Sequence, residues 1–292
     1  MRYWPLLLLL AFPTQAAEFT ASVERIKALT GPNAPADMRG PDICGTDLGT
    51  IAEQAGRLVF AFGDTFGYDN GACRRFGPNW RSNVIGFSTD TDPADGIAIE
   101  NWLEGVDGKA VAATEGAHQR AFSGEQTRIP TAMVAIGDRL YLHYMSVHGF
   151  AAAGGVWDCN WSRFIYSDDG GKSWTEAPDE FGGKDSNFNM LALSLNPRDL
   201  GHLYALGTKC GRFGAVRAGR VPVGSVLDPV AWQYYDGTGW VADPEAATDV
   251  VPPIAGEGSL VWNAGLGKWM YSTLNQDAEA IQLRLADDPW GP

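Results

Sequence analysis

Four short segments of the chain share one pattern, in which a glycine turn is followed by a run of apolar and aromatic residues. They are GRLVFAFGD at 56–64, GDRLYLHYM at 137–145, GHLYALGT at 201–208 and GKWMYST at 267–273. Their first glycines recur at intervals of roughly 65–80 residues, and most are followed by another strand-like run. Units of several strands at such a spacing are typical of the blades of an all-β propeller.

A second motif supports blades. The segment Ser167-Asp168-Asp169-Gly170-Gly171-Lys172-Ser173-Trp174 fits the pattern S-x-D-x-G-x-x-W. It is similar to the Asp-box of sialidase-type propellers, in which the Asp and Gly shape a hairpin turn and the Trp packs between strands. We expect a structural role for it. A sialidase would also need three arginines around the sugar carboxylate, and nothing in the sequence identifies them.

The N-terminus has the features of a signal peptide. Arg2 precedes the apolar run at 6–12, which is too short to span a bilayer, and small residues follow at 14–17. We therefore expect residues 1–17 to be removed and residues 18–292 to form one secreted or periplasmic domain. In that oxidising setting the four cysteines indicate two disulfides, and pairing of neighbours, Cys44–Cys73 and Cys159–Cys210, is favoured.

Charge narrows the class of partner. The formal net charge is −13, which disfavours nucleic acid and anionic membranes because both require a basic surface. An acidic surface suits a neutral polysaccharide, and the 11 tryptophans and 36 glycines fit an all-β protein with aromatic platforms. The cysteine spacing and four histidines indicate no zinc site. We expect no cofactor, no bound metal, no membrane insertion and a monomer.

Two aspartates stand out as candidate catalytic residues. Asp47 lies in the turn GTDLG, and Asp64 follows an apolar strand in FGDTFG. Glycine neighbours allow a ligand to approach the backbone closely. Glycoside cleavage uses two carboxyl groups, one that protonates the leaving oxygen and one that activates water or attacks the sugar. Aspartates in glycine-rich turns are also common for turn geometry alone, so spacing does not decide the role.

The order of motifs resembles a known family. GTDLG, FAFGDTFG, WRSNVIGFSTDTDPADGI and GEGSLVWNAGLGKWMYST together resemble the family catalogued as domain of unknown function 4185, now associated with endo-D-arabinanases of glycoside hydrolase family 183. The resemblance spans about 42–292. It implies a five-bladed propeller that cleaves α-linked D-arabinofuranosyl chains internally, with Asp47 and Asp64 as the catalytic pair. Relatives usually continue past the final Pro-Trp-Gly-Pro, so we expect an incomplete fifth blade here unless the N-terminal segment completes it.

Further residues are candidates for substrate binding, each with a turn, packing or capping role as the alternative. Glu257 in a glycine-rich turn is a candidate third acid. Polar and aromatic residues before predicted strands, or near them, are candidates for contacts with sugar hydroxyls and rings; these are Trp80, Arg81, Asn83, Arg128, Thr131, Asn160, Trp161 and Asn187.

The sequence therefore predicts an exported endo-acting glycoside hydrolase with an inverting two-aspartate mechanism. Carboxyl groups about 6.5–9.5 Å apart would indicate inversion, and about 5 Å retention. Two alternatives stay open. One is a non-catalytic glycan-binding propeller, and the other is a furanosidase on another furanoside polymer, for which Glu257 would matter more than one of the aspartates.

Overall fold

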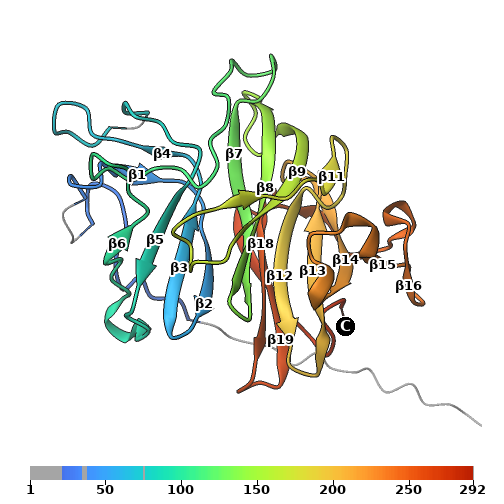
Figure 1. The fold of residues 1–292 in the computed structure, drawn as a ribbon. Helices are drawn as coiled ribbons and strands as arrows, with labels where there is room; N and C mark the ends of the chain where they lie inside the picture. The colour runs from blue at the N-terminus through green and yellow to red at the C-terminus, as the bar shows by residue number, and fades with distance from the viewer. Residues whose placement is uncertain (1–21, 35–37, 75, 292) are drawn as a thin grey trace, which may run out of the picture.

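The computed structural model describes residues 22–34, 38–74 and 76–291. The predicted signal peptide and its cleavage site lie outside these residues. The strands form four antiparallel sheets that stand side by side, together with one two-stranded ladder (Figure 1). The helices in the described residues are four single 3₁₀ turns, Pro93–Asp95, Val223–Ser225, Pro229–Ala231 and Pro244–Ala246. None of the described helices is long and apolar enough to cross a membrane.

The first two sheets take up the N-terminal half of the chain. The first contains β2 (Thr50–Gln54), β3 (Arg57–Phe62), β5 (Val84–Ser88) and β6 (Asn101–Trp102). The second contains β7 (Thr127–Ile136), β8 (Arg139–Phe150), β9 (Trp157–Ser167), β10 (Thr175–Glu176) and β11 (Gly182–Gly183). The small ladder pairs β1 (Gly45–Thr46) with β4 (Thr65–Phe66).

The other two sheets follow in chain order. The third contains β12 (Met190–Asn196), β13 (Asp199–Thr208), β14 (Gly214–Pro222), β15 (Gln233–Tyr235), β16 (Trp240–Val241) and β17 (Asp249–Ala255), the last paired with β14. The fourth contains β18 (Gly258–Asn263), β19 (Lys268–Asn275) and β20 (Ala280–Ala286). The four glycine-led repeats form β3, β8, β13 and β19, which are the second strands of their sheets, so the all-β propeller prediction is confirmed.

Apolar side chains between neighbouring blades form the core. Between the first and second blades they include Val59, Ile85, Leu140 and Ile165. Between the second and third they include Phe164, Leu191, Leu203 and Trp232. Between the third and fourth they include Val216, Leu260, Trp269 and Tyr271. Each large side chain removed from water contributes about 1.5–3 kcal/mol, so the interfaces between blades supply most of the hydrophobic stabilisation.

The number of blades differs from the expected five. The described residues form four, whose first strands β2, β7, β12 and β18 pack in that order, and β18 and β2 make no comparable contact. The described N-terminal residues do not supply a fifth sheet, because 22–34 and 38–44 contain no strand. Instead, Met38 and Ile43 pack against Phe60, Phe62 and Trp102 and cover the first blade.

The disulfide pairing and the Asp-box are as expected. Cys44 is bonded to Cys73, and Cys159 to Cys210, which ties β9 to the loop after β13. Two disulfides are consistent with an extracytoplasmic protein. The Asp169 carboxylate accepts hydrogen bonds from the backbone of Lys172 and Ser173, and it holds the turn after β9. Trp174 closes the turn by donating to the Gly171 carbonyl at 3.0 Å.

Candidate active site

The two candidate catalytic aspartates lie at the end of one backbone ladder. Beyond the β1–β4 pair, the Asp47 amide donates to the Asp64 carbonyl at 3.0 Å, and the Gly63 amide donates to the Asp47 carbonyl at 2.7 Å. Both residues line a cavity of about 440 Å³, which we call the acidic cleft. Its other lining residues are Pro32, Cys44, Gly45, Thr46, Phe66, Cys73, Arg74 and Phe76. The sequence motifs GTDLG and FGDTFG thus meet in one cavity.

The glycines of these motifs allow the two segments to approach. A β-carbon on Gly63 would lie 3.2 Å from the Asp47 carbonyl oxygen and 3.4 Å from the Ile129 side chain. After Asp47 the backbone turns through Leu48, which has a φ of +50°, a conformation that non-glycine residues adopt rarely. The turn leaves Asp47 exposed, with Oδ1 accepting from the Leu48 amide at 2.9 Å.

Asp64 is in a different environment from Asp47. Its Oδ1 accepts hydrogen bonds from the Thr127 hydroxyl at 2.5 Å and from the Trp80 indole at 2.7 Å. Burial raises the pKa of Asp64 to about 6, and the negative charge of Asp47 adds to the rise, whereas the two hydrogen bonds oppose it. A carboxyl group with this pKa is partly protonated near neutral pH, as a general acid requires.

Trp80 is held by two neighbouring rings. Its indole stacks on the His118 imidazole with 4.0 Å between ring centroids, and on Phe66 with 5.9 Å. His118 Nε2 lies 2.8 Å from a Glu115 carboxylate oxygen and 3.0 Å from the Ser82 hydroxyl. The donor to Asp64 is therefore held in one orientation.

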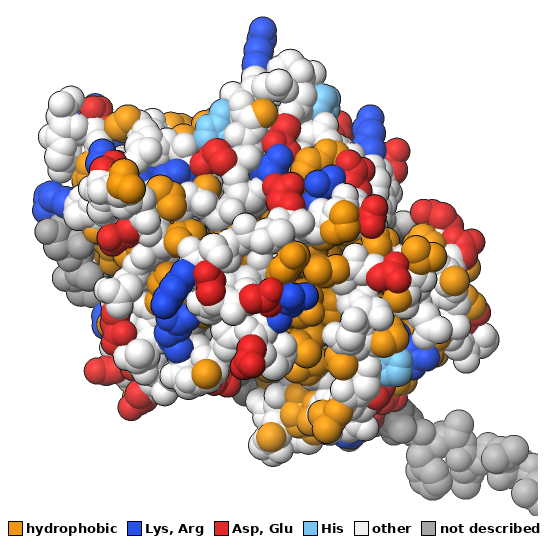
Figure 2. All heavy atoms as spheres, in the orientation of Figure 1, with side chains coloured by type: hydrophobic (Ala, Val, Ile, Leu, Met, Phe, Trp, Pro, Cys, Tyr) orange, Lys and Arg blue, Asp and Glu red, His pale blue; other side chains and the backbone are white. Residues whose placement is uncertain are grey.

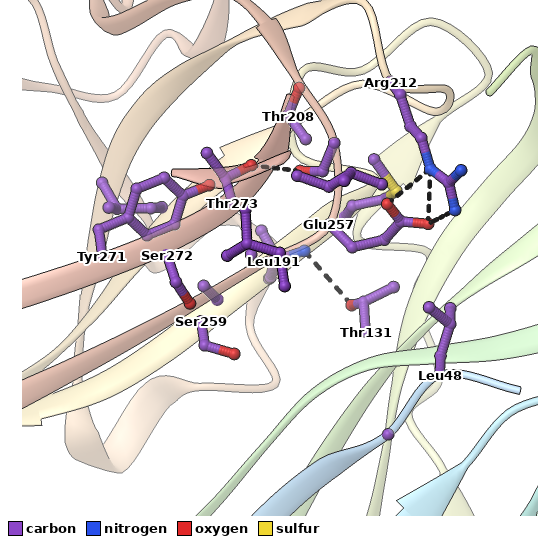
Figure 3. A pocket seen from close by; sticks show the side chains of 18 of the residues that line it. Leu48, Thr131, Leu191, Thr208, Arg212, Glu257, Ser259, Tyr271, Ser272 and Thr273 are labelled. Atoms are coloured by element: carbon purple, nitrogen blue, oxygen red, sulfur yellow. Dashed lines mark hydrogen bonds and ion pairs between the residues drawn. The ribbon is translucent and has the colours of Figure 1, made fainter. Parts of the chain in front are cut away.

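A second cavity of about 280 Å³ lies where the first strands of the blades meet, and we call it the axial cavity. It adjoins the acidic cleft, because Leu48 and Gly49 line it directly after Asp47. Figure 3 shows Arg212 and Glu257 facing one another across one side of it. The Arg212 Nε and Nη2 each donate to Glu257 at 2.9 Å.

Arg212 lines the axial cavity, and its charge interacts with that of Asp47, which lines the acidic cleft. Hydrogen bonding to Glu257 raises the pKa of Arg212, burial opposes the rise, and the charge of Asp47 adds a smaller increase. Arg212 also donates to the Gln276 side chain at 3.2 Å. It therefore stays charged, and its charge interacts with that of Asp47.

This geometry is suited to acid–base chemistry. One cavity holds an exposed carboxylate and a desolvated carboxyl group with a raised pKa, which is the asymmetry that separates a base from an acid. Among the residues that the structure describes, no group of three or more His, Cys, Asp and Glu side chains is placed to bind a metal ion.

Comparison with known proteins adds a family and a fold. The family model described as "Domain of unknown function (DUF4185)" matches residues 33–292. The chain belongs to this family. No curated protein matches the DUF4185 chain.

A solved glycoside hydrolase structure shares the fold of this DUF4185 protein at low sequence identity, and two arabinofuranosidase structures are more distantly similar. A family 117 glycoside hydrolase from the marine bacterium Zobellia galactanivorans is 14% identical, with a TM-score of 0.52 over 91% of this chain and 73% of the other. An α-L-arabinofuranosidase from Clostridium thermocellum is 12% identical, with a TM-score of 0.46 over 84% and 69%. An α-L-arabinofuranosidase from Podospora anserina, solved with cellotriose, is 15% identical, with a TM-score of 0.47 over 90% and 70%.

The polar residues predicted around the first blade of the DUF4185 chain are mostly engaged with protein groups. Arg81 is 4% exposed and donates to the carbonyls of Asp42 and Ala110. Asn83 is fully buried, and its amide group bonds the backbone of residues 113, 114 and 128. Neither side chain is among those that line the acidic cleft, and their contact with substrate stays a prediction.

Of the candidates on or near the second blade, one lines a cavity and the others contact protein groups or lie in a partly buried segment. Thr131 lines the axial cavity and its hydroxyl lies 2.6 Å from His143 Nδ1. Arg128 bonds Glu125 and Glu176, and Trp161 lies beside it with 5.5 Å from the guanidinium carbon to the ring centroid. The remaining two are not among the residues that line the cleft: Asn160 donates to the Ser146 hydroxyl, and Asn187 is half-buried in the segment before β12.

Three site residues carry no sequence signal that would have identified them. Thr127, His118 and Arg212 come from segments 63, 54 and 148 residues after Asp64. Only their contacts with Asp64, Trp80 or Glu257 show their place in the site. The position of Arg212, two residues after a disulfide cysteine, is the one feature that sets it apart along the chain.

Proposed function

We propose that the chain is an exported endo-acting glycoside hydrolase that cleaves α-D-arabinofuranosyl linkages in an arabinan-type polysaccharide. The observation that carries the proposal is the acidic cleft, in which Asp64 has a pKa raised to about 6 and the exposed Asp47 lines the same cavity. The fold shared with a family 117 glycoside hydrolase supports the reaction class. The choice of D-arabinan rests on the resemblance of the sequence motifs. The net charge of −13 favours a neutral glycan.

In this mechanism Asp64 is the general acid. Thr127 and Trp80 both donate to Oδ1, so Oδ2 is the oxygen that carries the proton. As the glycosidic C–O bond breaks, Oδ2 transfers this proton to the leaving oxygen. Asp47 takes a proton from a water molecule whose oxygen bonds to the anomeric carbon, and the product has inverted configuration.

Arg212 acts on Asp47 rather than on the sugar. Its positive charge interacts with the Asp47 carboxyl group, and its two bonds to Glu257 fix its position. We therefore propose that Arg212 and Glu257 position the site, and that Glu257 is not the acid, because Arg212 occupies both of its carboxylate oxygens.

The test is product analysis with purified mature protein and a D-arabinan. A ladder of oligosaccharides early in the reaction supports endo cleavage, whereas release of single arabinose units contradicts it. Proton NMR of the first product anomer tests inversion. Oligosaccharides from an L-arabinan or a fructan, with none from D-arabinan, would favour the furanosidase alternative, which the place of Glu257 in the axial cavity keeps open. Binding to the glycan without any product would favour the glycan-binding alternative.

A further inference from the structure

An exposed aromatic ring stands at the acidic cleft. Phe76 lines the cleft and is 70% exposed, the highest exposure of any aromatic side chain among the exposed hydrophobic residues that the structure describes. Its backbone has a φ of +57°, which a bulky non-glycine residue rarely adopts. Such a conformation persists only where the surroundings impose it, and it is found most often at functional sites.

Phe76 ends a row of rings that leads to the general acid. Its ring meets the edge of Phe66 with 5.6 Å between centroids and 88° between planes. Phe66 in turn stacks on Trp80, which donates to Asp64 at 2.7 Å. An apolar surface thus extends from solvent to the carboxyl group.

The loop that carries Phe76 is held in place at several points. Cys73 is bonded to Cys44, and the Gly67 amide donates to the Pro78 carbonyl at 2.7 Å. Asn79 donates to the Asp42 carboxylate at 2.7 Å. A β-carbon on Gly77 would collide with the Gly67 carbonyl oxygen, so the loop passes close to its own start. A ring held in this way loses little conformational entropy when a ligand packs on it.

We propose that Phe76 is a substrate-stacking residue, on which a neutral sugar ring of the glycan packs. This sugar is not one of the two joined by the glycosidic bond that is cleaved. The C–H face of a furanose ring is apolar and matches the face of a phenyl ring. The Cys44–Cys73 disulfide holds the platform at the cleft. This inference rests on the proposed function for its substrate class, and it adds the subsite that makes the enzyme prefer a chain to a single sugar.

Phe76→Ala tests the subsite, and two substrates separate it from catalysis. On D-arabinan we expect KM to rise about threefold to tenfold with kcat unchanged, because aromatic packing contributes up to about a factor of ten. On a small aryl arabinofuranoside, which does not reach the platform, we expect no change. Phe76→Tyr keeps the ring and should restore the KM.

Phe122→Ala is the matched control. Phe122 is also exposed, at 50%, and has a φ of +64°, but it is not among the residues that line the acidic cleft. Equal KM values for the Phe76 and Phe122 variants would overturn the subsite, and so would an equal loss on both substrates.

A binding measurement keeps the subsite testable if the wild type cleaves neither substrate, a result that would refute the proposed function. Calorimetric titration of an arabino-oligosaccharide into Asp64→Asn, with and without Phe76→Ala, should show affinity lower by the same threefold to tenfold. Equal affinity in the two variants, or no binding at all, would overturn the inference.

Discussion

The Asp47 amide donates a hydrogen bond to the Asp64 carbonyl at 3.0 Å, so the backbone itself sets the relative position of the two carboxyl groups. One is exposed, and the other is half-buried and accepts hydrogen bonds from Trp80 and Thr127. Because the two residues are joined through the backbone ladder that continues β1 and β4, we expect that either side chain can be replaced without moving the other. That makes their separate roles accessible to substitution.

Asp64→Asn should stabilise the protein above pH 6. The pKa of Asp64 in the folded protein, about 6, is higher than its ordinary 3.8, so the native state binds this proton more tightly than the unfolded chain. The stabilisation that the protonated Asp64 carboxyl group gives the wild type is fully present below pH 4 and is lost as the pH rises through 6, so the advantage of asparagine appears only at the higher pH. Asparagine keeps an acceptor for Thr127 and Trp80 and removes the desolvated charge. We expect the free energy of unfolding of the variant to exceed that of the wild type by about 2–3 kcal/mol at pH 8, as measured by urea unfolding.

Asp47→Asn is the control for this stabilisation, since Asp47 is exposed. It should abolish activity as fully as Asp64→Asn does, yet leave the unfolding free energy nearly unchanged. The same gain in stability for both variants, or a gain from Asp64→Asn that persists at pH 3.5, would refute the assignment of a desolvated acid.

Thr127→Val should shift the pH dependence of activity. In the wild type, kcat/KM should fall above about pH 6 as Asp64 loses its proton. The Thr127 hydroxyl lowers the pKa of Asp64, so its removal raises that pKa, and the alkaline limb should move up by roughly one pH unit. Thr131→Val is the comparison, because the hydroxyl of Thr131 contacts His143 instead. An unchanged limb in Thr127→Val would count against Asp64 as the acid.

Glu257→Gln tests which carboxyl group protonates the leaving oxygen. If Glu257 only positions Arg212, we expect a loss of about tenfold to a hundredfold in kcat/KM, because one charged contact contributes about 1.5–3 kcal/mol. An aryl arabinofuranoside with a very acidic phenol needs no proton donor and should restore activity to Asp64→Asn only. If this substrate restored activity to Glu257→Gln and not to Asp64→Asn, Glu257 would be the acid, and the furanosidase alternative would be supported.

Asp169→Ala should weaken the fold without affecting the site. The Asp169 carboxylate accepts hydrogen bonds from the amides of Lys172 and Ser173 and from the Ser173 hydroxyl at 2.7 Å, and these lower its pKa to about 2. Loss of this turn should reduce the unfolding free energy by about 1–2 kcal/mol with an unchanged KM. Asp168→Ala, which breaks an exposed ion pair with Arg139, should have a smaller effect. A change in KM for Asp169→Ala would mean that the turn also serves the substrate.

The blades could be predicted from the sequence because their signals are local. A glycine turn and an apolar strand identify β3, β8, β13 and β19 wherever they lie in space. A fifth blade could not be predicted in this way. It was expected only from the resemblance to a family, and the sequence contains no fifth repeat of this kind. The described N-terminal residues cover the first blade instead of forming another sheet.

The site residues also differ in whether a local sequence signal identifies them. Asp47 and Asp64 stand at strand ends beside glycines, which a sequence shows. Arg81 and Asn83 also look like binding residues in the sequence, since polar groups before a strand are usually exposed, but in the fold both are buried and bond backbone carbonyls or amides. Thr127 and Arg212 act only through contacts with segments distant in the chain. The distribution of charge on the surface does not identify the site either, because acidic and basic side chains are interspersed on the face that Figure 2 shows.

The most direct test of the central claim is to incubate D-arabinan with wild type, Asp47→Asn and Asp64→Asn, and to quantify the oligosaccharides released. Circular dichroism would confirm that all three are folded. We expect oligosaccharides from the wild type and a reduction of roughly a hundredfold to ten-thousandfold in both variants, since each removes a group used in the transition state. Cleavage by either variant at a rate near that of the wild type would show that the aspartate pair of the acidic cleft does not carry the reaction.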